Sequence, residues 1–507
     1  MNKFIKFFQQ NRKMILLFVV CVTVNYLSLL QLASERSDLS GSFFFILIAL
    51  IEFAVETALF IVIQRTQKKE IALEKLFLRI MIPMGLIFML VLPIGRVPDE
   101  DKHFYRAYEI SEGHLLSDKN ENGVGGGFLP EDVTMIFNAG NCHITYNQEI
   151  ALLQIETSDT KVFVQYPTSA LYCFVAYIPQ AIGIALGRLL NLPTLLIAYF
   201  GRLFNFAFFV AGIYYAIKLI PYKKASLIMI CLFPMMMQEA VSLSADVMTS
   251  LSAIYMVAYV LRIKYASKEP MHMRNYIAMG LICMALALCK IVYLPLCFLL
   301  LLIPKERFDG IKKKMLVLTI LFVFAIGFSL TWIFVSSGYL IEFQQGVMPF
   351  AQLSLILSEP LQYIQVFFHS IYQNCLFYFS GIVGQSLCWF DVNLSYWIVL
   401  LLPLLTGIVA ASEPKEFVRT CDRVWVILSV GATVILIFTA LYLQWTAYGS
   451  DVISGVQGRY FLPLLLPTLC LVGFQKKRSN VGILKYILPI AVSVDLYAAS
   501  VLLFAHL

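Results

Sequence analysis

Residues 314–335 read KMLVLTILFVFAIGFSLTWIFV, an apolar run in which Lys314 is the only charged side chain. An α-helix rises about 1.5 Å per residue, so roughly 20 apolar residues are needed to cross the hydrocarbon core of a bilayer. This run therefore predicts a transmembrane helix. Comparable runs recur at 14–34, 42–64, 75–95, 195–218, 224–241, 247–263, 394–411, 423–443, 457–474 and 481–504.

One further apolar stretch, residues 274–303, is long enough for two short helices broken near Lys290. We therefore predict an all-α polytopic integral membrane protein with about thirteen transmembrane helices. The composition excludes a soluble domain, because 60% of the 507 residues are hydrophobic, 14% are charged and the mean hydropathy is +0.80. Soluble proteins carry roughly 25% charged residues.

Lysine and arginine collect in clusters between the apolar runs, and cytoplasmic loops of membrane proteins retain such residues. With the helices above, every cluster falls on one side, so we expect the N-terminus inside and the polar segments 96–165, 336–360 and 444–456 outside. The net charge of +7 follows this topology, and no nucleic-acid partner is expected. The clusters are 3–13, 65–75, 223–224, 262–274, 305–314, 415–423 and 476–478.

The pattern divides the chain into three parts. Residues 1–74 form two N-terminal transmembrane helices, and residues 75–303 form a module with a large outer loop at 96–194. Residues 304–507 form the C-terminal helices, with outer loops at 336–393 and 444–456. Residues 166–190 are apolar enough to span, but a span there would place Lys223 and Lys224 outside, so we favour an interfacial helix in the outer leaflet.

The large outer loop has local signals of its own. Its start, HFYRAYEISEGHLL, has a helical pattern, and a glycine cluster follows at Gly123 and Gly125 to Gly127. The stretch TYNQEIALLQIETSDTKVFV has a weak strand signal. Loops of this length are usually functional or disordered.

The loop opens with RVPDEDKHFYR, in which Asp99, Glu100 and Asp101 lie next to His103 and between Arg96 and Arg106. Such a group of acids can act as a general base or bind a metal ion. A helix N-terminus explains the same residues, because acids are favourable in the first turn of a helix. Both interpretations stay open at this point.

Asp246 lies in SLSADVMTS between two apolar runs, again on the outer side. It can cap the helix that follows, although Ser244 could do so equally well. An acid at this depth in a membrane protein is a candidate functional residue by default.

Three cations lie at outer helix ends: Arg202 in YFGRLFN, Lys290 in LALCKIVYLPL and Arg459 in GVQGRYFLPL. Lipid-facing lysine and arginine side chains often extend to the headgroups, which explains one such residue. Three on the same side as the acids favour a site for a phosphate or pyrophosphate group.

Other chemistry lacks support. The sequence holds no P-loop, G-x-S-x-G, dinucleotide-binding or H-E-x-x-H motif, and no zinc-type cysteine spacing. A disulfide among Cys142, Cys375 and Cys388, which lie in outer segments, is an open alternative.

Six stretches resemble, in order and spacing, a family of bacterial predicted membrane proteins catalogued as domain of unknown function 2142. The resemblance covers about residues 75 to 474 and leaves the first two helices unmatched. The stretches are PDEDKHFYRAYEISEGHLL, VQYPTSALYCFVAYIPQAIGIALGRLL, YFGRLFNFAFF, LSADVMTS, LALCKIVYLPL and GVQGRYFLPLLLP.

That family looks like a branch of the GT-C glycosyltransferases, which transfer a sugar from a polyprenyl-phosphate carrier. The resemblance implies a GT-C-like fold in a bacterial cytoplasmic membrane. Asp99 and Glu100 match the first acidic position of the class, Asp246 matches the second, and Tyr166 with Pro167 loosely matches the start of its interfacial helix. The two helices before the span that leads into the loop are a departure, which puts a helix-by-helix correspondence in doubt.

The expected function is transfer of a sugar from a polyprenyl-phosphate donor to a cell-envelope glycan, teichoic acid or protein on the outer face, with Asp99 as the base and inversion at the anomeric carbon. We expect Asp99, Glu100 and Asp246 to be catalytic. The expected substrate-binding residues are Arg96, His103, Arg106, Tyr166, Arg202, Lys290 and Arg459.

No cofactor is required by this scheme, and a divalent cation, Mg²⁺ or Mn²⁺, between Asp99 and Asp246 stays an open alternative. Two other functions also stay open: a transporter or flippase of a lipid-linked oligosaccharide, and a non-catalytic membrane protein of envelope assembly. Transporters favour broken helices, acids near mid-membrane and internal repeats, and the sequence shows no clear repeat.

Overall fold

The computed structural model describes residues 2–35, 43–68, 72–137, 144–266, 269–339, 341, 344–414, 419–473 and 481–507. Among them, seven helices are long and apolar enough to cross a membrane, which confirms a multi-pass membrane protein. Thirteen crossings are not confirmed. The seven helices are α1 (Asn2–Ser34), α2 (Phe43–Lys68), α9 (Thr194–Leu219), α12 (Asp246–Leu261), α14 (Ile311–Ser336), α18 (Thr420–Gln444) and α20 (Val481–His506).

Shorter helices complete the bundle. Residues 274–303 form α13 (Met273–Cys289) and the 3-10 helix η4 (Ile291–Leu302), which meet at Lys290 as the sequence predicts. Helix α3 (Leu73–Val91) packs between α9 and α20, and α17 (Trp397–Ser412) packs against α20. A single large cluster of buried apolar side chains links these helices.

Two expected spans are not continuous helices. Residues 224–241 form α10 (Lys224–Cys231) and α11 (Pro234–Ala240), because Pro234 cannot continue the first helix and begins the second. Residues 457–474 form the 3-10 helix η7 (Gly458–Leu464) and the short α19 (Leu465–Leu469), in a stretch that contains Pro463 and Pro467. Proline has no backbone N–H group to donate within a helix, and η7 and α19 are both short.

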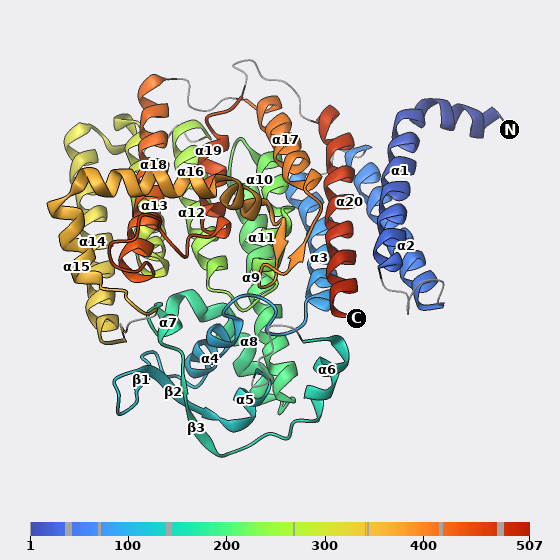
Figure 1. Ribbon diagram of the computed structural model, residues 1–507. Coiled ribbons are helices and arrows are strands. Elements are labelled where there is room, and N and C mark those ends of the chain that lie inside the picture. The colour runs from blue at the N-terminus through green and yellow to red at the C-terminus, as the bar shows by residue number, and fades with distance from the viewer. Residues whose placement is uncertain are drawn as a thin grey trace.

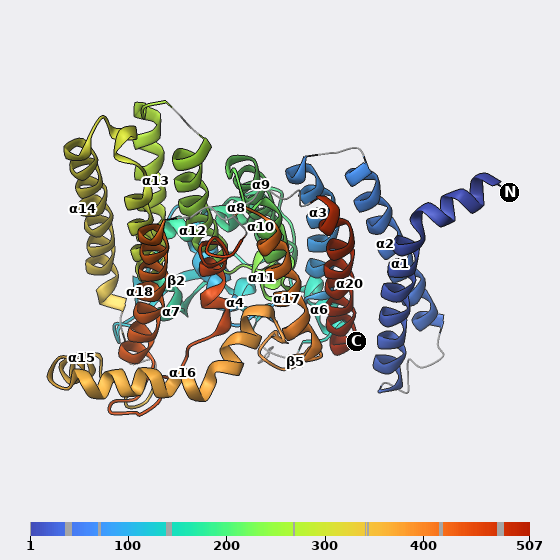
Figure 2. The same ribbon diagram turned by 90° about the horizontal axis from the view of Figure 1, so that it is seen from above.

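The segment 336–393, expected to be an outer loop, contains two helices, α15 (Pro349–Ser358) and α16 (Pro360–Val383). Figure 2 shows them lying crosswise to α13, α14 and α18 at one end of the bundle. The polar residues within α16, such as Gln365 and Asn374, lower its hydropathy below that of the spanning helices. A search for strongly apolar runs therefore does not find this helix.

The segment 96–194 forms a compact region at one end of the bundle, at the bottom of Figure 1. It begins with α4 (Glu100–Ser111), which matches the expected helical pattern. A three-stranded antiparallel sheet follows, in the order β1 (Asp118–Lys119), β2 (Gly125–Pro130) and β3 (Lys161–Gln165). Its short helices are α5 (Glu131–Met135), α6 (Tyr146–Ala151), the 3-10 turn η1 (Leu152–Gln154), α7 (Pro167–Ala170) and the 3-10 turn η2 (Phe174–Tyr177).

The weak strand signal is correct only for its last part. Residues 161–165 form β3, whereas TYNQEIALLQ forms α6 and η1, with Thr145 and Gln148 capping α6 reciprocally. The glycine cluster allows close strand pairing. A Cβ on Gly126 would lie 2.0 Å from the Val164 carbonyl oxygen, and one on Gly127 would lie 2.3 Å from the Tyr166 hydroxyl.

Residues 166–190 end in α8 (Ile178–Leu189), which packs against the first part of α9 and against α4. Gln180 in its first turn donates to the Ser244 carbonyl at 2.9 Å, and Arg188 in its last turn binds Glu112 at 3.1 Å. The helix therefore lies within the 96–194 region and does not cross the bundle (Figure 1).

Several of the basic clusters meet at the opposite end of the bundle from this region. Lys223 donates to the carbonyls of Ala410 and Val472, at 2.8 and 2.6 Å, and Lys264 binds Asp422 at 2.7 Å. These contacts place the start of α10, the ends of α12 and α17, and the start of α18 on one side. Residues 476–478 lie outside the described residues.

Cys142 also lies outside the described residues. Cys375 and Cys388 are both free thiols, the first exposed and the second buried. The expected alternative of a disulfide between these two is therefore wrong.

Candidate functional site

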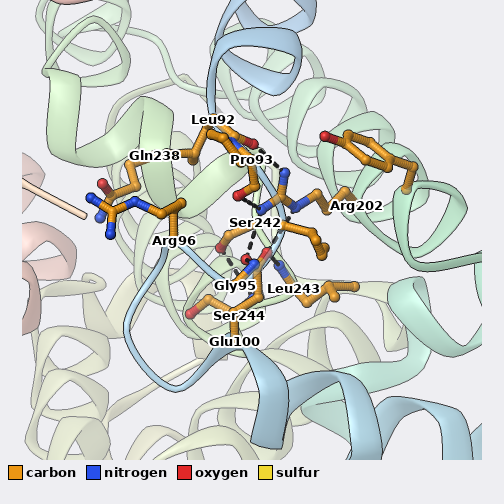
Figure 3. A network of polar contacts seen from close by, with 12 residues as sticks. Leu92, Pro93, Gly95, Arg96, Glu100, Arg202, Gln238, Ser242, Leu243 and Ser244 are labelled. Carbon is orange, nitrogen blue, oxygen red and sulfur yellow. Dashed lines mark hydrogen bonds and ion pairs between the residues drawn. The ribbon is translucent and has the colours of Figure 1, made fainter. Parts of the chain in front are cut away.

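The start of α4 is fixed by an ion pair between Glu100 and Arg202 of α9 (Figure 3). Arg202 Nε and Nη2 donate to the two carboxylate oxygens at 2.7 and 2.6 Å. Both side chains are fully buried, with 0% exposure. The contact is bidentate, the strongest geometry of an arginine–carboxylate pair.

The remaining polar atoms of this pair are bonded to backbone. Arg202 donates to the carbonyls of Leu92 and Pro93 at 2.6 and 3.0 Å, and Glu100 accepts from the backbone N–H groups of Gly95 and Leu243 at 2.8 and 3.2 Å. The pair thus ties the end of α3, the start of α4, α9 and the loop before α12 together. Neither side chain is open to a substrate.

Arg96 has a similar position. Its Nε donates to His506 at 2.6 Å and its Nη2 binds Asp391 at 2.6 Å, with 3% of the side chain exposed. It joins the loop before α4 to the end of α20 and to the hairpin of β4 (Ser386–Leu387) and β5 (Val392–Asn393). The sequence predicts substrate binding for Arg96, but the structure gives it protein partners.

Asp99 precedes α4 and points into a different environment. Its backbone is left-handed, with φ 63° and ψ 13°, a conformation that asparagine and aspartate tolerate better than other residues with a Cβ. Its side chain is 45% exposed and lies 3.9 Å from Arg459 Nη2. A strained residue at an open polar site is a frequent feature of functional sites.

Arg459, at the start of η7, connects Asp99 to a third acid. Its Nη1 binds Glu239 of α11 at 3.4 Å, and both side chains are buried, with exposures of 7% and 3%. Arg459 Nε and Glu239 Oε2 have no hydrogen-bond partner among the described residues. Buried polar atoms are usually hydrogen-bonded, so two unpaired atoms in one buried pair mark this pair as exceptional.

Asp246 and Lys290 form the other half of the cluster. Lys290 Nζ donates to Asp246 Oδ1 at 2.5 Å, with 14% and 16% of these side chains exposed. The ammonium also lies over the rings of Tyr172 and Tyr460, 5.4 and 5.0 Å from their centroids. The break between α13 and η4 brings Lys290 to the start of α12, where Asp246 lies.

His103 of α4 lies between the two halves. Its Nδ1 is 2.7 Å from the Tyr177 hydroxyl, and its side chain is buried. Burial lowers the pKa of His103 to about 4; Asp99 and Asp246 oppose the shift, while Arg459 and Lys290 add to it. His103 is therefore a neutral imidazole at pH 7, surrounded by two acids and two cations.

The lowered pKa of His103 predicts an acid-sensitive fold. An unfolded histidine has a pKa of about 6.5. Between this value and about 4, the unfolded chain binds more protons at this histidine than the folded chain does, so the free energy of unfolding decreases as the pH is lowered. Between about pH 7.5 and 4.5 we expect His103 alone to account for a loss of roughly 2–3 kcal/mol. Thermal unfolding at both pH values measures it.

The matched comparison uses two glutamine variants. His103→Gln can still hydrogen-bond Tyr177 and should lose less stability at low pH than the native chain, while His114→Gln, at an exposed position of the same region, should behave like the native chain. Equal pH sensitivity of His103→Gln and the native chain would contradict a depressed pKa at His103.

Arg106 and Tyr166 lie in a separate network. Arg106 binds Glu109 within α4 and donates to the Leu115 carbonyl at 2.7 Å, and Glu109 accepts from Ser117 at 2.8 Å. Tyr166 is fully buried beside Gly127. This network supports the sheet of the 96–194 region, and the structure does not bring it into the cluster around Asp99.

The cluster is therefore Asp99, His103, Glu239, Asp246, Lys290 and Arg459, which we call the acid–cation cluster. Sequence reasoning missed Glu239, which lies inside an apolar run where an acid is itself a signal of function. A half-exposed carboxylate beside an arginine can accept a proton while the cation binds an anion.

A divalent cation is poorly supported by these residues. Among the described residues, no group of three or more His, Cys, Asp or Glu side chains is arranged to hold a metal ion. Asp246 is bonded to Lys290, and Asp99 lies next to Arg459. Cations of the protein thus lie next to both carboxylates for which a shared metal ion was an open alternative.

Comparison with known proteins gives one match. A family model described as "Predicted membrane protein (DUF2142)" matches residues 82–468, which include every residue of the acid–cation cluster. No curated protein and no solved structure matches the chain.

Proposed function

The chain belongs to this family of predicted membrane proteins, and we propose that it is a membrane glycosyltransferase. The donor is a sugar on a polyprenyl phosphate, and the acceptor is a hydroxyl of an envelope glycan, a teichoic acid or a protein outside a bacterial cytoplasmic membrane. The observation that carries the proposal is Asp99, 45% exposed and 3.9 Å from Arg459, at the end of a membrane-embedded bundle.

In this mechanism Asp99 accepts the proton of the acceptor hydroxyl as its oxygen attacks the anomeric carbon. The bond from that carbon to the phosphate oxygen breaks, and its electron pair leaves with the polyprenyl phosphate, which gives inversion. The phosphate gains negative charge in the transition state, so a preformed cation next to it lowers the barrier. Arg459 is the cation assigned to this role, because its Nη2 lies 3.9 Å from Asp99.

The other cluster residues have supporting roles. Asp246 holds Lys290 at 2.5 Å, which positions the second cation, and Glu239 holds Arg459 at 3.4 Å. Neutral His103 fills the space between the two pairs without adding charge. Glu100, Arg202 and Arg96 position the loop that carries Asp99 and do not contact the substrate.

The test uses the purified full chain in lipid nanodiscs. It is incubated with a panel of polyprenyl-phosphate hexoses and pentoses, with or without an envelope fraction as acceptor, and free polyprenyl phosphate is measured by mass spectrometry. Release that depends on both the acceptor and the chain is expected. Movement of the intact donor across liposomes without any release would instead indicate a flippase and overturn the proposal.

Arg459→Lys should lower kcat/KM for the donor by roughly 10- to 100-fold. Lysine keeps the charge opposite Glu239, so the buried pair stays compensated, but it lacks the planar fork that binds phosphate at two points. Steady-state release of polyprenyl phosphate measures the effect.

Arg188→Lys is the matched control, because Arg188 is 31% exposed and binds Glu112 outside the cluster. It should leave kcat/KM within about twofold of the native value. Equal rates for the two variants would remove Arg459 from the phosphate site.

A further inference from the structure

Helices α15 and α16 lie across one end of the bundle (Figure 2), in a segment for which the sequence predicts an outer loop. Between residues 349 and 383, Glu359 is the only charged side chain. A contiguous exposed apolar face normally marks a surface that something else covers. The large exposed apolar side chains of the two helices are Phe350 (88%), Leu357 (74%), Leu361 (74%), Phe368 (63%), Tyr372 (82%) and Leu376 (78%).

The exposed side of α16 is divided into an apolar face and a polar edge. Leu361, Phe368 and Tyr372 are seven and four residues apart, so the helical period places them on one face. His369 and Gln373 each follow one of these residues, which turns them by about 100° onto the neighbouring side of the helix. Gln373 Nε2 lies 3.0 Å from His369 Nε2. Such a division is typical of a helix at a boundary between lipid and water.

The third side of α16 packs on the end of the spanning helix α18, and this contact fixes its depth. The Tyr363 hydroxyl lies 2.6 Å from the Thr439 hydroxyl. Thr439 is five residues before the end of α18 at Gln444, which is about 7.5 Å along the helix axis. On the polar edge, His369 Nδ1 lies 3.1 Å from the carbonyl oxygen of Asp451, in the loop that follows α18. Helices that lie in a membrane interface bury their apolar face to a depth of about 5–10 Å.

The helices that α15 and α16 contact expose apolar side chains of their own. α15 packs against α18, in which Ile435 and Leu436 are 49% and 39% exposed, and α16 also contacts α17, in which Leu400 and Leu404 are 71% and 60% exposed. Lipid covers the exposed side of a helix that crosses a membrane, as α18 does. The apolar face of α16 therefore continues a surface that the bilayer already covers.

We propose that α15 and α16 are embedded in the membrane interface, with their apolar face in the acyl chains of one leaflet and the polar edge of α16 at the headgroups. The leaflet is the one on the side of the 96–194 region. The β4–β5 hairpin follows α16 directly, and its Trp389 donates to the carbonyl of Gly95, just before α4, at 3.0 Å. The bilayer, and not a second protein, is thus the partner of this surface.

The experiment compares two neighbouring residues of α16 in the purified full chain in phospholipid nanodiscs, without any sugar donor. Cys142→Ser, Cys375→Ser and Cys421→Ser remove the two exposed thiols of the described residues and the one outside them. Tyr372→Cys or Gln373→Cys is then labelled with a nitroxide. Electron paramagnetic resonance measures its collisions with oxygen, which concentrates in acyl chains, and with a water-soluble nickel chelate. The ratio of oxygen to nickel collisions should be at least about fivefold higher at residue 372 than at residue 373.

Two reference sites calibrate the ratio. Leu330→Cys on the spanning helix α14 provides the lipid value, and Leu116→Cys in the 96–194 region provides the water value; these leucines are 57% and 52% exposed. Labelling the native Cys375 in a Cys142→Ser and Cys421→Ser chain repeats the measurement on the apolar side of α16 without any substitution in that helix.

Three results would overturn the proposal. A water-like ratio at residue 372 would show an aqueous helix, and a lipid-like ratio at both 372 and 373 would place α16 deeper than an interface. Few collisions with either reagent at residue 372 would show that a second copy or another protein covers the face. None of these results depends on transferase activity.

Discussion

Asp99→Asn is expected to lower kcat for sugar transfer by about 10²- to 10⁴-fold, the usual contribution of a general base. The amide cannot accept the proton of the acceptor hydroxyl, but it keeps the size of the side chain. Asparagine also tolerates the left-handed backbone at this position, where φ is 63°, better than alanine does. The loss should therefore appear in kcat, with the amount and thermal stability of the inserted protein unchanged.

Asp101→Asn is the matched control, because it changes an acid two residues further along the chain, in the first turn of α4. Asp101 binds Lys102 at 2.9 Å at a partly exposed position and is not a member of the acid–cation cluster. Its transfer rate should stay within about twofold of the native value, as for most exposed ion pairs. Normal turnover in Asp99→Asn would assign the base to another group and end the proposed mechanism.

The membrane class and several helices could be predicted from apolar run length, because lipid selects strongly for that property. The runs at 14–34, 42–64, 195–218 and 314–335 each correspond to a long helix. Continuity within a run could not be predicted in the same way. Whether Pro234 interrupts a helix or only bends it depends on the packing of its neighbours, and α16 is hidden by its own polar residues.

The candidate site was predictable in part. Acids and cations of one side of the bundle do meet, and Asp246 with Lys290 is the clearest case. The sequence could not show which acid binds which cation, because the partners are far apart in the chain. Glu100 and Arg202 are 102 residues apart, and Arg459 and Glu239 are 220 apart.

These pairings divide the three expected phosphate-binding cations into two groups. Arg202 is fully buried against Glu100, while Lys290 and Arg459 remain in the acid–cation cluster around Asp99. A cation at an outer helix end is therefore expected to pair with an acid. Whether a ligand can also reach the cation depends on how deeply that ion pair is buried. The sequence alone does not distinguish a cation that forms a buried structural ion pair from a cation that binds a ligand.

Arg202→Ala is expected to destabilise the chain by about 3–5 kcal/mol, because it leaves the buried carboxylate of Glu100 without its counter-charge. It also removes the donors of the Leu92 and Pro93 carbonyls, which hold the loop before Asp99. Thermal unfolding in detergent and the yield of monodisperse protein measure the effect. Arg188→Ala, which breaks a partly exposed pair, should cost less than about 1 kcal/mol.

A double-mutant cycle separates this structural role from substrate binding. Glu100→Gln removes the unpaired charge, so Glu100→Gln with Arg202→Ala should be more stable than Arg202→Ala alone, with an interaction energy of about 1–3 kcal/mol. A substrate-binding arginine would show no such coupling. Its loss would raise the donor KM and leave the melting temperature near that of Arg188→Ala. That second pattern would contradict the structural role and assign Arg202 to phosphate binding. The side chain has 0% exposure, so substrate binding would then require the ion pair with Glu100 to open during turnover.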